Sequence, residues 1–137
     1  DSPSGPDLVS PEHYRQYAYP HVRRLVADLR ARGVRLSYHI CGNATPIIRD
    51  MVSTGAAIIE IDQKADMATC KAAARGQSIL LGPIDPNEVL AQGTPDLVRQ
   101  KSAEAIALLG RGGGFVLGPG CALPDGSPAL PPLPMRN

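Results

Sequence analysis

The fold is indicated most clearly by the stretch Val34-Arg35-Leu36-Ser37-Tyr38-His39-Ile40-Cys41-Gly42. Its first part has the apolar pattern of a β-strand. Where that pattern ends, His39 and Cys41 place an imidazole and a thiol two residues apart. Thr45-Pro46 then supplies the residues that typically begin a helix. The stretch therefore predicts a strand, a loop with potential metal ligands, and a helix.

Segments of strand length alternate with helical patterns along the whole chain. We expect strands at 34–40, 56–62, 78–82 and 115–117, and helices at 10–32, 45–54, 66–75 and 94–109. Pro20 predicts a kink in the first helix. The expected strands are almost continuously apolar, which is typical of parallel strands that are buried on both faces. This α/β pattern fits either half of a (β/α)₈ TIM barrel or a small doubly wound sheet.

Residues with useful chemistry follow the ends of the expected strands. Besides His39 and Cys41, they are Asp62, Gln63, Asp85 and Cys121. In a barrel and in an open parallel sheet alike, the carboxyl ends of the strands lie at one end of the fold, where functional groups collect. We therefore expect these side chains to lie near one another.

His39, Cys41 and Cys121 are candidate zinc ligands. Zinc binds thiolate and imidazole groups tetrahedrally, and catalytic sites use three protein ligands and keep one position open. Residues i and i+2 of a strand share a face, so His39 and Cys41 can point to the same side. An open site of this kind would hold a substrate thiol as its thiolate at neutral pH, where a free thiol is mostly protonated. Such chemistry suits alkyl transfer to sulfur.

Simpler interpretations exist for most of these residues. A cysteine is often a small buried apolar side chain, and this is the interpretation we favour for Cys70, which falls within a helical pattern. His21 lies on the apolar face of the first helix and is expected to be a packing residue. Asp62 and Asp85 could each either cap the following helix or contact a substrate.

Composition excludes several classes of function. The chain has 137 residues, a net charge of +1 and 4% aromatic residues, which argues against nucleic-acid binding. No apolar run approaches the roughly 20 residues of a membrane span. Three cysteines, without the features of a signal peptide, argue against a disulfide framework. We expect a cytoplasmic enzyme.

Six motifs along residues 7–125 resemble the uroporphyrinogen decarboxylase superfamily, and within it the corrinoid-dependent methyltransferases of the cobalamin:coenzyme M type. They are Leu8–Tyr14, His39–Pro46, Ile61–Gln63, Leu81–Pro86, Gly93–Pro95 and Leu117–Cys121. The resemblance implies the C-terminal half of a (β/α)₈ TIM barrel. We expect it to occupy residues 1–123, with a proline-rich tail at 124–137.

The resemblance also implies a function. His39, Cys41 and Cys121 match the zinc ligands of the methyltransferase branch. The implied activity moves a methyl group between methylcobalamin, carried by a corrinoid partner protein, and a thiol or methylated substrate. Residues within the motifs are expected to bind substrate, and no catalytic side chain beyond the metal site is expected. The expected substrate-binding residues are Asn43, Asp62, Gln63 and Asp85.

Three departures from the family keep two alternatives open. Pro83 stands where the family usually has Asn, the tail is proline-rich where the family continues as a helix, and the N-terminal half of the barrel is missing. A missing half-barrel or a second copy of the chain would have to complete the pocket. The alternatives are a decarboxylase acting on a tetrapyrrole, although the decarboxylases lack the His-x-Cys-Gly motif, and a truncated half-barrel without activity.

Overall fold

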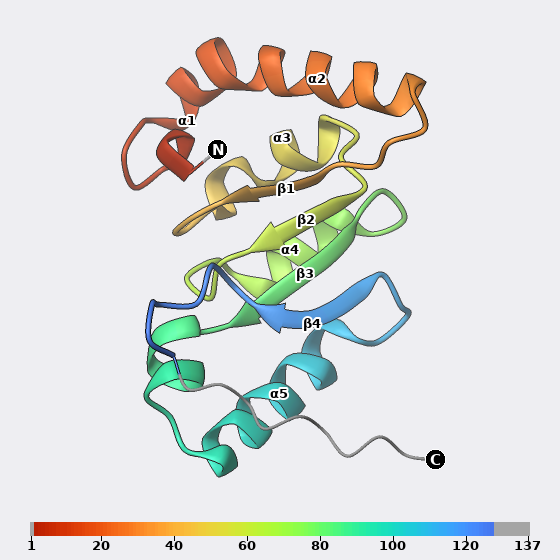
Figure 1. Ribbon diagram of the computed structural model, residues 1–137. Coiled ribbons are helices and arrows are strands. Elements are labelled where there is room, and N and C mark those ends of the chain that lie inside the picture. Colours follow the sequence, from red (N-terminus) through yellow and green to blue (C-terminus); the bar gives the residue numbers. More distant parts are fainter. Residues whose placement is uncertain (1, 128–137) are drawn as a thin grey trace.

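The computed structural model describes residues 2–127 as a parallel four-stranded sheet whose strands alternate with helices (Figure 1). The strands are β1 (Ser37–Ile40), β2 (Ile58–Ile61), β3 (Ile79–Ile84) and β4 (Phe115–Pro119). Each strand pairs in parallel with the next one along the chain, in the order β1-β2-β3-β4. A doubly wound sheet reverses its strand order at a switch point, whereas a barrel keeps it sequential. The predicted fold class is therefore confirmed as a partial, barrel-like α/β unit.

The helices connect consecutive strands or precede the first. The α-helices are α1 (Pro11–His13), α2 (Tyr19–Ala31), α3 (Ile48–Ser53), α4 (Met67–Ala74) and α5 (Pro95–Leu109). Four further turns are 3₁₀- or π-helical: η1 (Ser2–Ser4), η2 (Tyr14–Ala18), η3 (Thr45–Ile47) and η4 (Pro86–Ala91). Most of the predicted proline-rich tail lies outside the described residues. The boundary between a domain at 1–123 and this tail stays a prediction.

The first helical segment differs from a regular α-helix where Pro20 enters it. Ser10 caps its start by accepting a hydrogen bond from the His13 amide. A π-helical turn, η2, then comes directly before α2, and the Tyr19 amide donates to the Tyr14 carbonyl. Because proline has no amide hydrogen, a regular α-helix would leave a carbonyl one turn earlier without a donor. The predicted irregularity is therefore a change of helix type ahead of Pro20.

One face of the sheet forms the core. Alternate strand residues point toward the helices and have almost no exposed surface: Tyr38, Ile40, Ile59, Ile61 and Leu80. They share a core with residues of η3, α3, α4 and α5, among them Ile47, Ile48, Met51, Cys70 and Leu109. In this core the Tyr14 and Tyr38 hydroxyls lie 3.2 Å apart and share a hydrogen bond.

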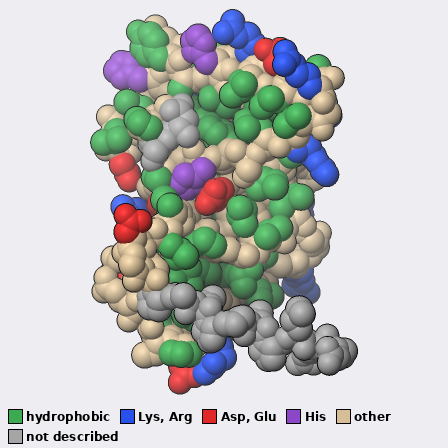
Figure 2. All heavy atoms as spheres, in the orientation of Figure 1, with side chains coloured by type: hydrophobic (Ala, Val, Ile, Leu, Met, Phe, Trp, Pro, Cys, Tyr) green, Lys and Arg blue, Asp and Glu red, His purple; other side chains and the backbone are tan. Residues whose placement is uncertain are grey.

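The other face of the sheet is not covered by helices (Figure 1). Ile79 is 38% exposed and Val116 is 48% exposed, and hydrophobic side chains spread over the strands on this side (Figure 2). The prediction of strands buried on both faces is therefore wrong for the described chain. In a closed barrel this face would point inward, so its apolar residues fit a barrel of which only a part is present.

Two features of the strands bear on the site. The first strand begins three residues later than predicted, at Ser37, and Val34 is 49% exposed. β3 and β4 both extend two residues further than predicted, to Ile84 and Pro119.

Within residues 2–127, no helix combines the length and apolar character that crossing a membrane requires.

Candidate metal centre

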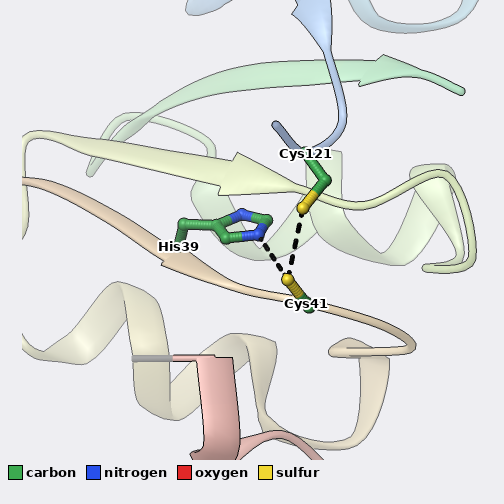
Figure 3. Close-up of side chains that lie close together, drawn as sticks. All are labelled: His39, Cys41 and Cys121. Atoms are coloured by element: carbon green, nitrogen blue, oxygen red, sulfur yellow. Dashed lines mark hydrogen bonds between the residues drawn. The ribbon is translucent and has the colours of Figure 1, made fainter. Parts of the chain in front are cut away.

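His39 and Cys41 project from the carboxyl end of β1 toward the uncovered face of the sheet. His39 pairs in register with Glu60 of β2, and neither belongs to the buried set that faces the helices. The His39 Nε2 atom lies 3.1 Å from the Cys41 Sγ atom (Figure 3). The predicted placement of an imidazole and a thiol on one side, two residues apart, is therefore what the structure has.

Cys121 reaches this pair from the far edge of the sheet. β1 and β4 are separated by three strand spacings, roughly 14 Å. After β4 the chain turns back over the ends of β3 and β2 (Figure 1), and the Gly120 amide donates to the Ile84 carbonyl at 2.8 Å. The Cys121 Sγ atom ends 3.3 Å from the Cys41 Sγ atom.

Gly120 makes this return possible because it has no side chain. A Cβ atom on Gly120 would lie 3.0 Å from the Gln63 amide nitrogen and 3.1 Å from the Ile61 carbonyl oxygen. Both are backbone atoms that cannot rotate away. A Cβ atom would therefore force a shift of the segment that carries Cys121, and a branched side chain would force a larger one.

The orientation of the His39 ring is set by the backbone of β2. Its Nδ1 atom lies 3.2 Å from the Glu60 carbonyl oxygen, which can only accept a hydrogen bond. In the tautomer that donates from Nδ1 to this carbonyl, Nε2 would present its lone pair toward Cys41. Metal-binding histidines are commonly fixed by a hydrogen bond of this kind from the other ring nitrogen.

The three side chains fit a tetrahedral zinc ion. Their ligand atoms all lie within 4.8 Å of one another, and each residue is partly buried. Ideal zinc bonds would separate the two sulfur atoms by about 3.8 Å, and the nitrogen from a sulfur by about 3.5 Å. The observed 3.3 and 3.1 Å require an outward movement of roughly half an ångström to admit the ion. A tetrahedral ion held by these two thiols and one imidazole would have its fourth position open.

Without a cation the Cys121 thiol favours its protonated form, because its pKa is raised. Burial raises the pKa of Cys121, and the hydrogen bond with Cys41 raises it further. A bound metal ion reverses this preference because it replaces the protons on its thiol ligands.

Asp62 holds the loop that carries Cys41. Its carboxylate is 6% exposed and accepts hydrogen bonds from the Gly42 amide at 2.9 Å and the Lys64 amide at 3.0 Å. Gly42 has a φ of 81°, in the left-handed region that favours glycine. Asp62 therefore ties the ends of β1 and β2 together, a role that sequence reasoning did not foresee. Asp66, rather than Asp62, caps the next helix.

Asp85 and Gln63 form a second polar contact beside the site. Asp85 caps η4 by accepting from the Asn87 and Glu88 amides at 2.8 and 2.9 Å, so the capping interpretation was right. The Gln63 amide group donates to Asp85 at 3.1 Å. The Gln63 Oε1 atom is buried and has no hydrogen-bond partner among the described residues.

The remaining candidates are accounted for by local structure. Asn43 accepts a hydrogen bond from the Thr45 amide at 3.1 Å, in the loop after Cys41. Substrate contacts by Asn43, Asp62, Gln63 and Asp85 stay a prediction. Cys70 is fully buried in the core, as expected, and burial raises the pKa of its thiol to about 11. Glu60 was missed because it acts through its carbonyl oxygen, which every residue has.

Fold and site together define a parallel α/β half-barrel with a candidate His-Cys-Cys metal centre at the carboxyl ends of its strands. The chain belongs to the uroporphyrinogen decarboxylase (URO-D) family, whose sequence profile matches residues 1–130. The family predicted from the motifs is therefore confirmed.

Relatives in this family carry two kinds of name. The methylcobamide:CoM methyltransferase MtbA of Methanosarcina acetivorans is 31% identical over 123 residues, which cover 90% of this chain and 35% of that protein. MtaA of Methanosarcina barkeri is 29% identical, over an alignment that covers all of this chain and 37% of MtaA. The uroporphyrinogen decarboxylase of Psychromonas ingrahamii is 29% identical over 80% of this chain and 31% of its own length.

A solved structure agrees with the fold. A methyltransferase from Methanosarcina mazei superimposes with a TM-score of 0.78 at 28% identity, over 93% of this chain and 36% of that one. The chain thus spans about a third of the length of the relatives it matches. Membership of the family leaves methyltransferase and decarboxylase both open, and the side chains at the site have to decide between them.

Proposed function

We propose that this chain is the zinc-binding part of a methyltransferase that moves a methyl group between a corrinoid carried by a partner protein and a thiol or methylated substrate. The observation that carries the proposal is the meeting of His39, Cys41 and Cys121 within 4.8 Å at the carboxyl ends of the strands. The names of the methylcobamide:CoM methyltransferase relatives support the same chemistry.

The residues of the site have distinct parts in this chemistry. A bound zinc ion would act as a Lewis acid that keeps a substrate thiol ionised near neutral pH. Cys41 and Cys121, as thiolates, would cancel the charge of the ion, so that a substrate sulfur stays electron-rich. His39 completes the set, with its ring held by the Glu60 carbonyl.

Residues around the site would position the substrate. Gln63 has a buried acceptor atom that finds no partner within residues 2–127, which suits a hydrogen-bond donor on the substrate. Asp85 keeps the Gln63 side chain in place through their 3.1 Å hydrogen bond. We assign Gln63 and Asn43 as candidate contacts and Asp62 and Asp85 as residues that hold the loops.

A complete pocket requires more protein than this chain. The uncovered apolar face and the two unpaired edges, along β1 and β4, are features that proteins normally cover. We propose that the N-terminal half of the barrel, in the same longer polypeptide or as a separate chain, covers them. A second copy of this chain is the other candidate.

The decarboxylase alternative rests on relatives such as the one from Psychromonas ingrahamii. A decarboxylase function would leave unexplained why three potential metal ligands, His39, Cys41 and Cys121, lie together. For this reason we rank it second.

Metal content tests the proposal directly. We expect the purified chain to bind about one zinc ion, measured by elemental analysis, since the ligand set provides one tetrahedral site. Replacing Cys41 and Cys121 by Ser should abolish binding. The matched control is Cys70→Ala, which removes the third thiol from the core and should keep the zinc. Wild-type protein that folds but binds no zinc would refute the metal site.

Activity is a separate test, with the N-terminal half supplied. We expect transfer of the methyl group from methylcobalamin to an added thiol, followed by the change in corrinoid absorbance. Turnover of a methoxylated aromatic substrate but of no thiol would move the assignment to demethylation. Decarboxylation of a tetrapyrrole by the protein after both cysteines are replaced would favour the alternative.

A further inference from the structure

A cavity lies at the end of the sheet opposite the metal centre, where the strands begin. Its volume is about 550 Å³, within the range of small-molecule sites. It is bounded by the start of β3, the end of α4 and the turn between α5 and β4. The residues that matter for its chemistry are Arg35, Lys71, Arg75, Arg111 and Gly112–Gly114.

The charged residues that line the cavity are all basic. Four cationic side chains face the cavity and no acidic residue lines it. Within residues 2–127, the guanidinium groups of Arg35, Arg75 and Arg111 form no ion pair or hydrogen bond. Arg15, by contrast, pairs with Asp50 at 2.8 Å. Basic side chains are visible on the right of Figure 2, the side where the strands begin.

The backbone of the adjoining turn adds donors to these cations. Gly112, Gly113 and Gly114 have φ angles of 79°, 74° and 67°, and a Cβ atom on any of them would meet nothing within 4 Å. The amides of Gly112 and Gly114 donate no hydrogen bond to another described residue. Lys71 donates to the Gly113 carbonyl and so fixes the turn against α4. The turn therefore presents amide hydrogens without an acceptor in residues 2–127 beside the arginines.

Several cations gathered without an acid are unfavourable unless an anion joins them. Planar guanidinium groups match the oxygen atoms of phosphate in pairs, and amides add further hydrogen bonds. From these groups we propose a binding site for a small phosphorylated molecule in this cavity. A net charge of +1 and an aromatic content of 4% give no support for a nucleic acid as the ligand.

This site is independent of the metal centre. β3 runs for six residues between the two ends of the sheet, a length of roughly 17 Å. No residue of the cavity belongs to the His-Cys-Cys cluster. The site could therefore exist whether or not the chain binds zinc, and its test needs no catalytic activity.

Pyrophosphate is the probe for the first experiment. We expect saturable binding of pyrophosphate to the purified chain by titration calorimetry at low salt, with weakening as salt screens the charges. The double variant R75Q/R111Q should bind at least about tenfold more weakly. The matched control is R23Q/R24Q, which removes two exposed arginines of α2 and should bind like the wild type.

Three outcomes would overturn the proposal. The first is an absence of saturable pyrophosphate binding by the wild-type protein. The second is an equal loss of pyrophosphate affinity in R75Q/R111Q and R23Q/R24Q, which would mean that only the net charge of the protein matters. Tighter binding of a tricarboxylate than of pyrophosphate would make the cavity a carboxylate site. Circular dichroism of each variant, with its zinc content, separates these outcomes from misfolding.

Discussion

The two ends of the same four strands are built in different ways. At the carboxyl ends, side chains bond to backbone and to one another: Asp62 and Asp85 each accept two backbone amides, and His39 is held by a carbonyl. At the amino ends, three arginines have no ion-pair or hydrogen-bond partner in the described chain, and the turn beside them contains three consecutive glycines. Fixed geometry suits a metal ion, which demands defined distances. Unpaired charge suits a ligand that brings the opposite charge.

The largest effect is expected where a side chain is introduced at the carboxyl end. Gly120→Val would place branched atoms against the Gln63 amide and the Ile61 carbonyl and displace Cys121. Zinc affinity, measured by competition with a chelator, should fall by about a hundredfold or more. Gly112→Ala is the control at the amino end, where a Cβ has open space. It should cost about 1 kcal/mol of stability because φ is positive, and leave zinc affinity unchanged. Equal zinc affinity in both variants would contradict the assigned role of Gly120.

The next effect tests how firmly the loops hold the ligands. Asp62→Ala would leave the Gly42 and Lys64 amides without their acceptor and loosen the loop after Cys41. Zinc affinity should fall by about tenfold and the free energy of unfolding by about 2 kcal/mol. Asp28→Ala, an exposed carboxylate of α2, is the matched control and should change neither quantity. An unchanged zinc affinity in Asp62→Ala would show that the loop keeps its position by other means.

A pH effect is expected in the core between the two ends. Burial raises the pKa of Cys70 from 9.0 to about 11, so the folded chain keeps this thiol protonated after the unfolded chain has ionised. The stability that Cys70 contributes is therefore complete below pH 9 and is lost as the pH rises toward 11. The loss should reach about 2 kcal/mol in chemical unfolding measured across this range. Other groups also titrate at alkaline pH, so the quantity to follow is the difference in free energy of unfolding between wild type and Cys70→Ala. A difference that stays constant from pH 9 to 11 would disprove the prediction.

The smallest effect belongs to the amino end. Arg111→Gln removes a cation that forms no ion pair or hydrogen bond within the described residues. The free energy of unfolding should change by less than about 0.5 kcal/mol in thermal melts without added anions. With pyrophosphate present, the wild type should gain stability relative to the variant by mass action. A large loss of stability without any anion would mean that Arg111 has a structural partner.

The sequence was sufficient for the family, the parallel α/β pattern and the three candidate ligands, because these depend on local patterns and quoted motifs. The cap formed by Asp85 was one of two interpretations, and its position before Pro86 and Glu88 supports it in hindsight. The path of the chain at Gly120, which brings Cys121 back to Cys41, could not be predicted from the sequence. It depends on contacts with Ile61 and Gln63, about sixty residues away. The exposed strand face was also missed. An apolar strand looks the same in sequence whether the protein that covers it is part of the chain or not.

The meeting of Cys41 and Cys121 also has a consequence for the topology of the unfolded chain. An ion held by both residues would cross-link positions 80 residues apart, and the closed loop would contain every element from η3 to β4. By the chain-entropy relation for cross-links, closing a loop of this length lowers the conformational entropy of the unfolded state by an amount worth about 4.5 kcal/mol. Parallel sheets form slowly because their strands pair over long stretches of chain. Metal captured early would bring the two edge strands within reach before the sheet between them has formed.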